Sequence, residues 1–99
     1  MGEHPFKNLY SLTDEQLASL DAAEEAMERG RLTESEKILL EMLEHDENCI
    51  PVLSNLGHLH GKYFSEYETA VQYYEKVINL EPDNAWARDE RRKYLRWLE

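Results

Sequence analysis

The chain has 99 residues, of which 41% are hydrophobic and 32% charged, a composition typical of one folded domain rather than a disordered segment. Its net charge of −10 disfavours nucleic acid as a partner, because phosphate contacts depend on Lys and Arg side chains. No apolar run approaches the roughly 20 residues that span a bilayer, and the N-terminus lacks the features of a secretory signal, so we expect no membrane partner. A single cysteine, Cys49, suits a reducing compartment, and we predict the cytoplasm.

Charge is unevenly distributed along the sequence. Residues 1–84 hold 18 acidic and 6 basic side chains, a sum of −12. Residues 85–99 hold 3 acidic and 5 basic side chains, a sum of +2. The C-terminal segment therefore has the opposite sign from the rest of this acidic protein.

Few glycines and prolines interrupt the chain, and strand-like alternation is absent, which predicts an all-α fold. Residues 1–12 form an N-terminal arm before a single helical domain at 13–99. The arm is too apolar for a solvated tail, because it contains Phe6, Leu9, Tyr10 and Leu12. We expect it to fold over the first helices as a cap, or else to insert into a neighbouring molecule.

The first two helices are predicted from apolar residues at helical spacing. The first runs from about 14 to 29, and its inward stripe consists of Leu17, Leu20, Ala23, Ala26 and Met27. Gly30 then supplies the left-handed residue that ends it. The second runs from about 34 to 44 and directs inward Ile38, Leu39, Met42 and Leu43.

Three further helices follow. The third extends from about 51 to 63, with Pro51 in its first turn, where a missing N–H is harmless. The fourth runs from about 66 to 80, and either Asp83 or Asn84 caps the fifth, at 85–98. The inward residues of the fifth are Trp86, Tyr94, Leu95 and Leu98. For Trp97 the sequence leaves three alternatives: a core anchor, an exposed patch, or part of a self-association surface.

Capping boxes, in which a Ser or Thr is followed three residues later by Glu or Gln, mark three of the predicted helix starts. They lie at 13–16, 33–36 and 65–68. The helix pairs also repeat: Gly57 follows Ala23 by 34 residues, and Tyr74 follows Leu39 by 35. The second spacing is one residue longer than the first. We expect this additional residue in a loop at 61–65, where an insertion costs little stability.

The spacing Leu53-x-x-Leu56-Gly57-x-x-His60, then Ala70-x-x-x-Tyr74 and Pro82, resembles the tetratricopeptide repeat pattern W-x-x-L-G-x-x-Y…A-x-x-x-F…P. Small residues at Gly57 and Ala70 are expected where two helices approach closely. The resemblance implies an α-α superhelix of five helices, with repeat one at 16–49, repeat two at 50–84 and a capping helix at 85–98. The last helix is alternatively the opening of a third repeat.

In that family the first helix of each pair lines a concave surface on which peptides bind. By position, the resemblance assigns partner contacts to Leu17, Leu20, Asp21, Glu24 and Glu28, and in the second repeat to Ser54, Asn55, His58 and Lys62. These residues predict an acidic surface with an apolar floor, which a basic or amphipathic peptide complements. We therefore predict a protein-interaction module, and the alternative is a self-associating module that forms a homo-oligomer.

Residue patterns typical of catalysis are missing from the sequence. His58 and His60 are two positions apart, so a helix points them about 200° away from each other, the wrong geometry for a shared metal. The chain contains no Gly-rich phosphate loop and no nucleophile motif. We expect no enzymatic activity, no cofactor and no metal.

Overall fold

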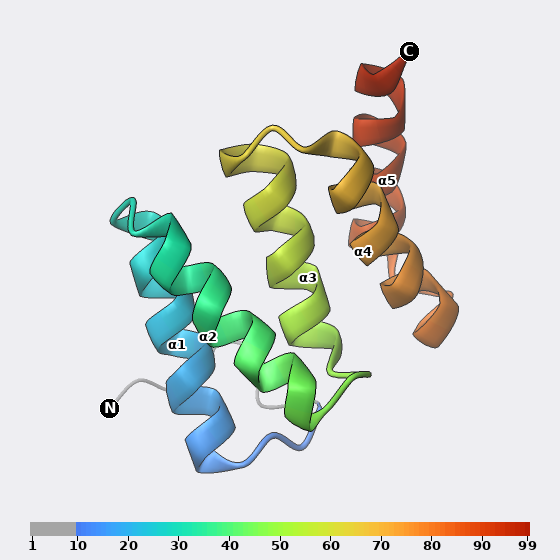
Figure 1. The fold of residues 1–99 in the computed structure, drawn as a ribbon. Coiled ribbons are helices and arrows are strands. Elements are labelled where there is room, and N and C mark those ends of the chain that lie inside the picture. Colours follow the sequence, from blue (N-terminus) through green and yellow to red (C-terminus); the bar gives the residue numbers. More distant parts are fainter. Residues whose placement is uncertain (1–9) are drawn as a thin grey trace.

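The computed structural model describes residues 10–99, which fold into five α-helices (Figure 1). The helices are α1 (Asp14–Glu28), α2 (Leu32–His45), α3 (Ile50–His58), α4 (Tyr67–Leu80) and α5 (Ala85–Leu98). No strand occurs among the described residues, so the prediction of an all-α fold with five helices is confirmed.

Each helix packs on its neighbours in the chain. In Figure 1 the row runs from α1 and α2 through α3 to α4 and α5, with α2 lying over α1 and α4 over α5. The described part is elongated, with principal extents of 42 × 30 × 24 Å. This helix-turn-helix packing agrees with the predicted fold class, and the superhelix itself stays a prediction.

The core consists of two clusters of buried apolar side chains. One lies among α1, α2 and α3 and includes Leu39 and Leu56. The other lies among α3, α4 and α5 and includes Tyr74 and Tyr94. The α3 helix therefore contributes to both clusters, because its two flanks face different helix pairs.

Local signals decide both ends of α1. The Thr13 hydroxyl accepts from the backbone N–H of Gln16 at 3.0 Å, and the Gln16 side chain accepts from the Thr13 N–H at 2.8 Å. At the other end Gly30 has a φ of +82°, a conformation that costs glycine little. The backbone N–H of Arg31 donates to the carbonyl of Ala26 at 2.8 Å and closes the turn. Both predicted ends are confirmed.

The capping boxes predicted at 33–36 and 65–68 are wrong. Helix α2 begins at Leu32 with Arg31 at its N-cap, because the tight turn that ends α1 brings the chain into helical conformation before Thr33 is reached. Ser65 has a φ of +57°, whereas a capping residue needs an extended backbone. Glu66 is instead the N-cap residue of α4.

The starts of α3 and α5 follow the sequence signals. Pro51 lies in the first turn of α3, as predicted. Of the two candidate caps for α5, Asn84 is the one used, since its side chain accepts from the backbone N–H of Ala87 at 2.9 Å.

Directly after α3 the helix continues as a π-helical segment, Leu59–Tyr63. Here the backbone N–H of Phe64 donates to the carbonyl of Leu59, five residues back, at 3.1 Å. The third helix therefore extends to Tyr63 as predicted. The loop predicted at 61–65 for the additional residue is wrong in its first part, because a widened helical turn occupies those positions.

Two glycines in this region lie against buried aromatic rings. A Cβ on Gly57 would lie 2.8 Å from ring atoms of Tyr74, and one on Gly61 would lie 2.7 Å from Cε2 and Oη of Tyr94. The close approach expected at Gly57 is thus a ring from α4 seated on the backbone of α3. Ala70 is buried in the same cluster as Tyr74.

The described part of the N-terminal arm folds onto the helices. Leu12 is buried in the cluster that contains Leu20 and Met27, which agrees with the predicted cap over the first helices. The Tyr10 hydroxyl donates to the carboxylate of Glu81, just after α4, at 3.0 Å to Oε1. Burial raises the pKa of Tyr10, and the adjacent carboxylate raises it further. Phe6 and Leu9 lie outside the described residues.

Only part of the predicted inward face of α5 is buried. Tyr94 and Ala87 face the core, whereas Trp86, Leu95 and Leu98 are exposed, so their predicted burial is wrong. The reason is packing on one side only, since α4 is the main neighbour of α5 and covers a single stripe of it. Trp97 is 52% exposed, with its edge against the rings of Tyr67 and Tyr94.

Candidate functional site

Side chains of α3 lie beside those of α1 at one end and beside those of α5 at the other. The Asn55 amide donates to Glu24 Oε2 at 3.1 Å and to the Pro51 carbonyl at 3.0 Å, which links α3 to α1. We define the α1–α3–α5 face as the side that carries Asp21, Glu24, Glu28, Ser54, Asn55, His58, Lys62, Glu90 and Lys93. The structure thus brings the predicted positions Glu24 and Asn55 into direct contact.

The α5 end of this face surrounds His58. The His58 ring lies edge-on to Tyr63 at 5.8 Å between centroids and is half-buried. Burial lowers the pKa of His58 from its usual 6.5, the charge of Lys62 lowers it further, Glu90 raises it, and Lys93 lowers it. These influences place groups from α3, the π-helical segment and α5 close together.

One of the nine predicted contacts belongs to the interior, and a second lies partly at the surface. Leu20 is only 1% exposed, so its assignment to a partner surface is wrong: the side chain lies in the core between α1 and its neighbours. Leu17 is half-buried and packs against the same cluster. Asp21, Glu28 and Lys62 are exposed, and Ser54 is half-buried.

The charges on the face are divided between its two ends. The α1 end holds the carboxylates of Asp21, Glu24 and Glu28. At the other end lie Lys62 and Lys93. The surface was predicted to be acidic with Lys62 among its residues, and Lys93 adds a second cation at the α5 end, where it pairs with Glu90.

Lys93 is the principal residue of this face that sequence reasoning missed. Its ammonium group lies 3.1 Å from Glu90 Oε1 and 4.7 Å from the centroid of the Tyr94 ring. The Trp97 ring is 5.6 Å away. A cation held over two aromatic faces is attracted by their ring quadrupoles. The spacing of Lys93, Tyr94 and Trp97 on one helix is compatible with this cation–aromatic contact. Only the packing of α5 in the structure shows that Lys93 lies near His58.

A prediction follows from the surroundings of His58. Since its pKa is lower in the folded state than in the unfolded state, His58 contributes stability that is present above about pH 6.5 and is lost as the pH falls through the folded pKa. We expect Lys62→Gln to raise that folded pKa, because it removes a neighbouring positive charge. An NMR titration of the His58 ring protons measures the shift. Lys37→Gln, on α2, is the control and should leave the value unchanged, and a wild-type pKa above the usual value would contradict the placement.

A second cluster lies on the α2 side and centres on His60, which is 7% exposed. Its Nε2 lies 3.2 Å from Glu36 Oε2 on α2, and its Nδ1 lies 2.6 Å from Glu66 Oε1 at the start of α4. The Nδ1 contact with Glu66 is a hydrogen bond, and the Nε2 contact with Glu36 is a close approach to a second carboxylate. Together they tie the π-helical segment to α2 and α4.

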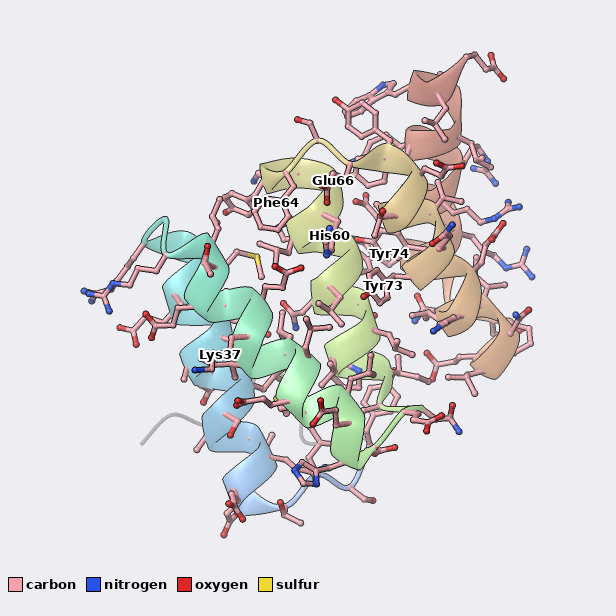
Figure 2. All side chains as sticks on the ribbon, in the orientation of Figure 1. Lys37, His60, Phe64, Glu66, Tyr73 and Tyr74 are labelled. Carbon is pink, nitrogen blue, oxygen red and sulfur yellow. The ribbon has the colours of Figure 1, made fainter. Side chains whose placement is uncertain are left out.

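Aromatic rings enclose this histidine. The His60 ring stacks on Tyr73 at 5.6 Å between centroids and meets the edge of Phe64 at 5.2 Å. Figure 2 shows Glu66, Phe64 and Tyr73 gathered around His60. Burial raises the pKa of Tyr73, and the charge of Glu36 raises it further. His60 is therefore buried at a position of the repeat pattern, and neither carboxylate partner was foreseen: Glu66 follows it by six positions, whereas Glu36 belongs to another helix.

The His60 cluster has the character of a structural junction. Both ring nitrogens already face carboxylate oxygens, so neither is directed at open solvent or at a reacting group. Among residues 10–99, no group of three or more His, Cys, Asp or Glu side chains is placed to share a metal ion.

Comparison with known proteins yields no relative: no family model and no curated protein matches this sequence. Every helix of the described region is too short or too polar to cross a membrane. The α1–α3–α5 face and the His60 junction must therefore be interpreted from their own chemistry.

Proposed function

We propose that this chain is a protein-interaction module of the tetratricopeptide repeat type, and that its α1–α3–α5 face binds a basic or amphipathic peptide. The single observation that carries the proposal is the hydrogen bond from Asn55 to Glu24, which joins α1 and α3 into one continuous surface. Side chains held by such a contact are already ordered before a ligand arrives. Less conformational entropy is then lost on binding.

The charge of the α1 end supports the choice of partner. Glu24 and Glu28 are separated by four positions and therefore lie on the same side of α1. Carboxylates on one helix face attract Lys and Arg side chains and repel acidic segments. Half-buried Leu17 lies on that same side of α1 and offers some apolar surface.

Titration of a Lys/Arg-rich peptide against charge-reversed variants tests the proposal. Glu24→Lys and Glu28→Lys should each weaken binding about tenfold, because an attractive charge becomes a repulsive one. Glu41→Lys has the same change of charge on an exposed position of α2 and serves as the matched control. Unchanged affinity in both α1 variants, or an equal loss in the Glu41→Lys control, would refute the proposed face.

The proposed role is binding without catalysis, cofactor or nucleic acid, and the proposed compartment is the cytoplasm. Cys49 is buried and free, and burial raises the pKa of its thiol, so the reactive thiolate is disfavoured. A protected thiol of this kind is compatible with a reducing compartment.

Self-association is a second candidate, and the exposed aromatic residues of α5 favour it. Trp86 is 47% exposed and Trp97 is 52% exposed. Exposed apolar surface of this size can mark a site of protein–protein contact. Sedimentation equilibrium over a range of concentrations distinguishes the candidates. A mass that rises with concentration in the wild type, and that is lower in a Trp97→Ser variant at the same concentration, would support a homo-oligomer. A constant monomer mass in the wild type would exclude it.

A further inference from the structure

A pocket of about 340 Å³ lies between α4 and α5. Its walls include Glu75 and Ile78 from α4, and Arg88, Arg91, Arg92 and Leu95 from α5. Arg88 and Leu95 are seven positions apart on α5, and helical geometry directs them away from Glu90 and Lys93. The pocket is therefore separate from the α1–α3–α5 face, on the opposite side of the same helix.

The pocket concentrates positive charge in an acidic protein. Three guanidinium groups and one carboxylate line it, which gives +3 − 1 = +2. The whole chain has a net charge of −10. An anionic ligand would meet a local attraction here despite the negative charge of the whole chain, and a cationic ligand would be repelled.

The three arginines are held in place but keep donors available. Nε and Nη2 of Arg91 both lie 3.2 Å from Glu75 Oε2, and Arg88 Nε donates to the Pro82 carbonyl at 2.7 Å. Arg92 makes an exposed contact with Asp89 of the same helix at 3.3 Å, a kind of pair that contributes little. A guanidinium has five N–H donors, so each arginine can still bind a carboxylate.

The apolar residues define the rest of the ligand. Ile78 and Leu95 form a hydrophobic patch among the guanidinium groups, and Leu95 is 36% exposed. An apolar side chain of a ligand would cover this patch while flanking carboxylates reach the arginines. Asn79 adds a neutral amide to the same lining.

We propose that the α4–α5 pocket binds an acidic amphipathic peptide of a partner protein, in which an apolar residue is flanked by Asp or Glu. Charge complementarity carries the choice, because the lining is cationic and bidentate arginine–carboxylate contacts are strong and specific. A nucleic-acid backbone fits less well, since it offers no apolar side chain for Ile78 and Leu95. This site goes beyond the proposed function, which concerns a basic ligand on the opposite side of α5.

The test uses a fluorescently labelled peptide of Leu, Glu and Asp, and a matched peptide with Lys in place of each acid. The acidic peptide should bind the full chain, lose affinity as salt is added, and bind at least about tenfold better than the Lys peptide. Arg88→Glu should weaken its binding about tenfold, since one favourable contact becomes repulsive. Arg96→Glu is the control, because it makes the same change of charge on α5 outside the pocket lining.

Four outcomes would overturn the proposal. The first is equal affinity for the two peptides, and the second is an equal loss of affinity in Arg88→Glu and Arg96→Glu. The third is tighter binding of a single-stranded oligonucleotide than of the acidic peptide. The fourth is a protein mass that rises with concentration while peptide binding is lost. The last outcome would show that a second copy occupies the pocket. Circular dichroism on each variant excludes unfolding as the cause of a loss. The α1 variant Glu28→Lys should keep its affinity for the acidic peptide, which separates this test from that of the proposed function.

Discussion

Replacement of Gly61 by alanine is expected to lower the free energy of unfolding by about 1–3 kcal/mol, the usual cost of an added methyl group in a packed core. The added Cβ would lie 2.7 Å from Cε2 and Oη of Tyr94, which is 1% exposed, so the ring must shift within the core to make room. Alanine normally stabilises a helix interior relative to glycine by about 1 kcal/mol, so a net loss would report the steric conflict alone. Urea denaturation followed by circular dichroism measures it.

A second substitution identifies the clashing ring. Tyr94→Leu removes the part of the side chain that meets Gly61, so Gly61→Ala should cost much less in that background than in the wild type. The neighbouring Lys62→Ala changes an exposed position of the same segment and is expected to alter stability by no more than about 0.5 kcal/mol. If Gly61→Ala stabilised the protein, the close seat of Tyr94 on the π-helical segment would be wrong.

His60→Leu is expected to destabilise the protein by about 1.5–3 kcal/mol, because it removes a hydrogen bond to the Glu66 carboxylate and a second polar contact while keeping much of the side-chain volume. The lost contacts are those to Glu36 and Glu66, which tie the π-helical segment to α2 and α4. Contact with the Tyr73 ring is preserved in part by the leucine. Thermal and urea unfolding curves measure the effect.

A double-mutant cycle separates hydrogen bonding from packing at this junction. Glu66→Gln should reduce stability in the wild type, since a neutral amide oxygen accepts a hydrogen bond from the His60 ring more weakly than a carboxylate does. In the His60→Leu background the same change should have almost no effect. Equal costs of Glu66→Gln in the two backgrounds would show that the 2.6 Å contact contributes nothing and that His60 acts by packing alone.

The two sides of α5 suggest how binding at both surfaces would be organised. Glu90 and Lys93 border the face shared with α1 and α3, whereas Arg88 and Leu95 border the pocket shared with α4. The ligands proposed for the two surfaces have opposite charge. The helix α5 would thus border two surfaces with different ligands, because Glu90 and Lys93 lie on one of its sides and the three pocket arginines on the other.

Helix positions and most of the core follow from the sequence itself. Apolar residues at helical spacing predict Leu39, Tyr74 and their neighbours as buried, and they are. The ends of α1 follow from Thr13 and Gly30, since a capping hydroxyl and a left-handed glycine act within one turn of chain. Interactions between residues close in sequence need no knowledge of the rest of the fold.

Two local predictions fail, the capping boxes at 33–36 and 65–68, because the turns before them set a different backbone conformation. The other failures depend on distant parts of the chain. Helical spacing correctly places Leu20 on the inward stripe of α1, and the wrong assignment is the partner contact implied by the resemblance. Leu95 and Leu98 are expected inward but are exposed, because only one side of α5 has a substantial neighbour. Burial on α5 therefore depends on what packs against the helix.

The sequence by itself determined the five helices, the acidic character of the molecule and the basic character of its C-terminal segment, because these depend on local spacing and composition. Only the tertiary structure decided that His60 meets Glu36 and Glu66, that Asn55 meets Glu24, and that arginines of α5 face α4 across a pocket. Such pairings arise from the relative placement of whole helices. That placement is set by ring-against-backbone contacts such as Tyr74 on Gly57. The repeat pattern marks both residues, but the contact between them exists only when the helices are packed.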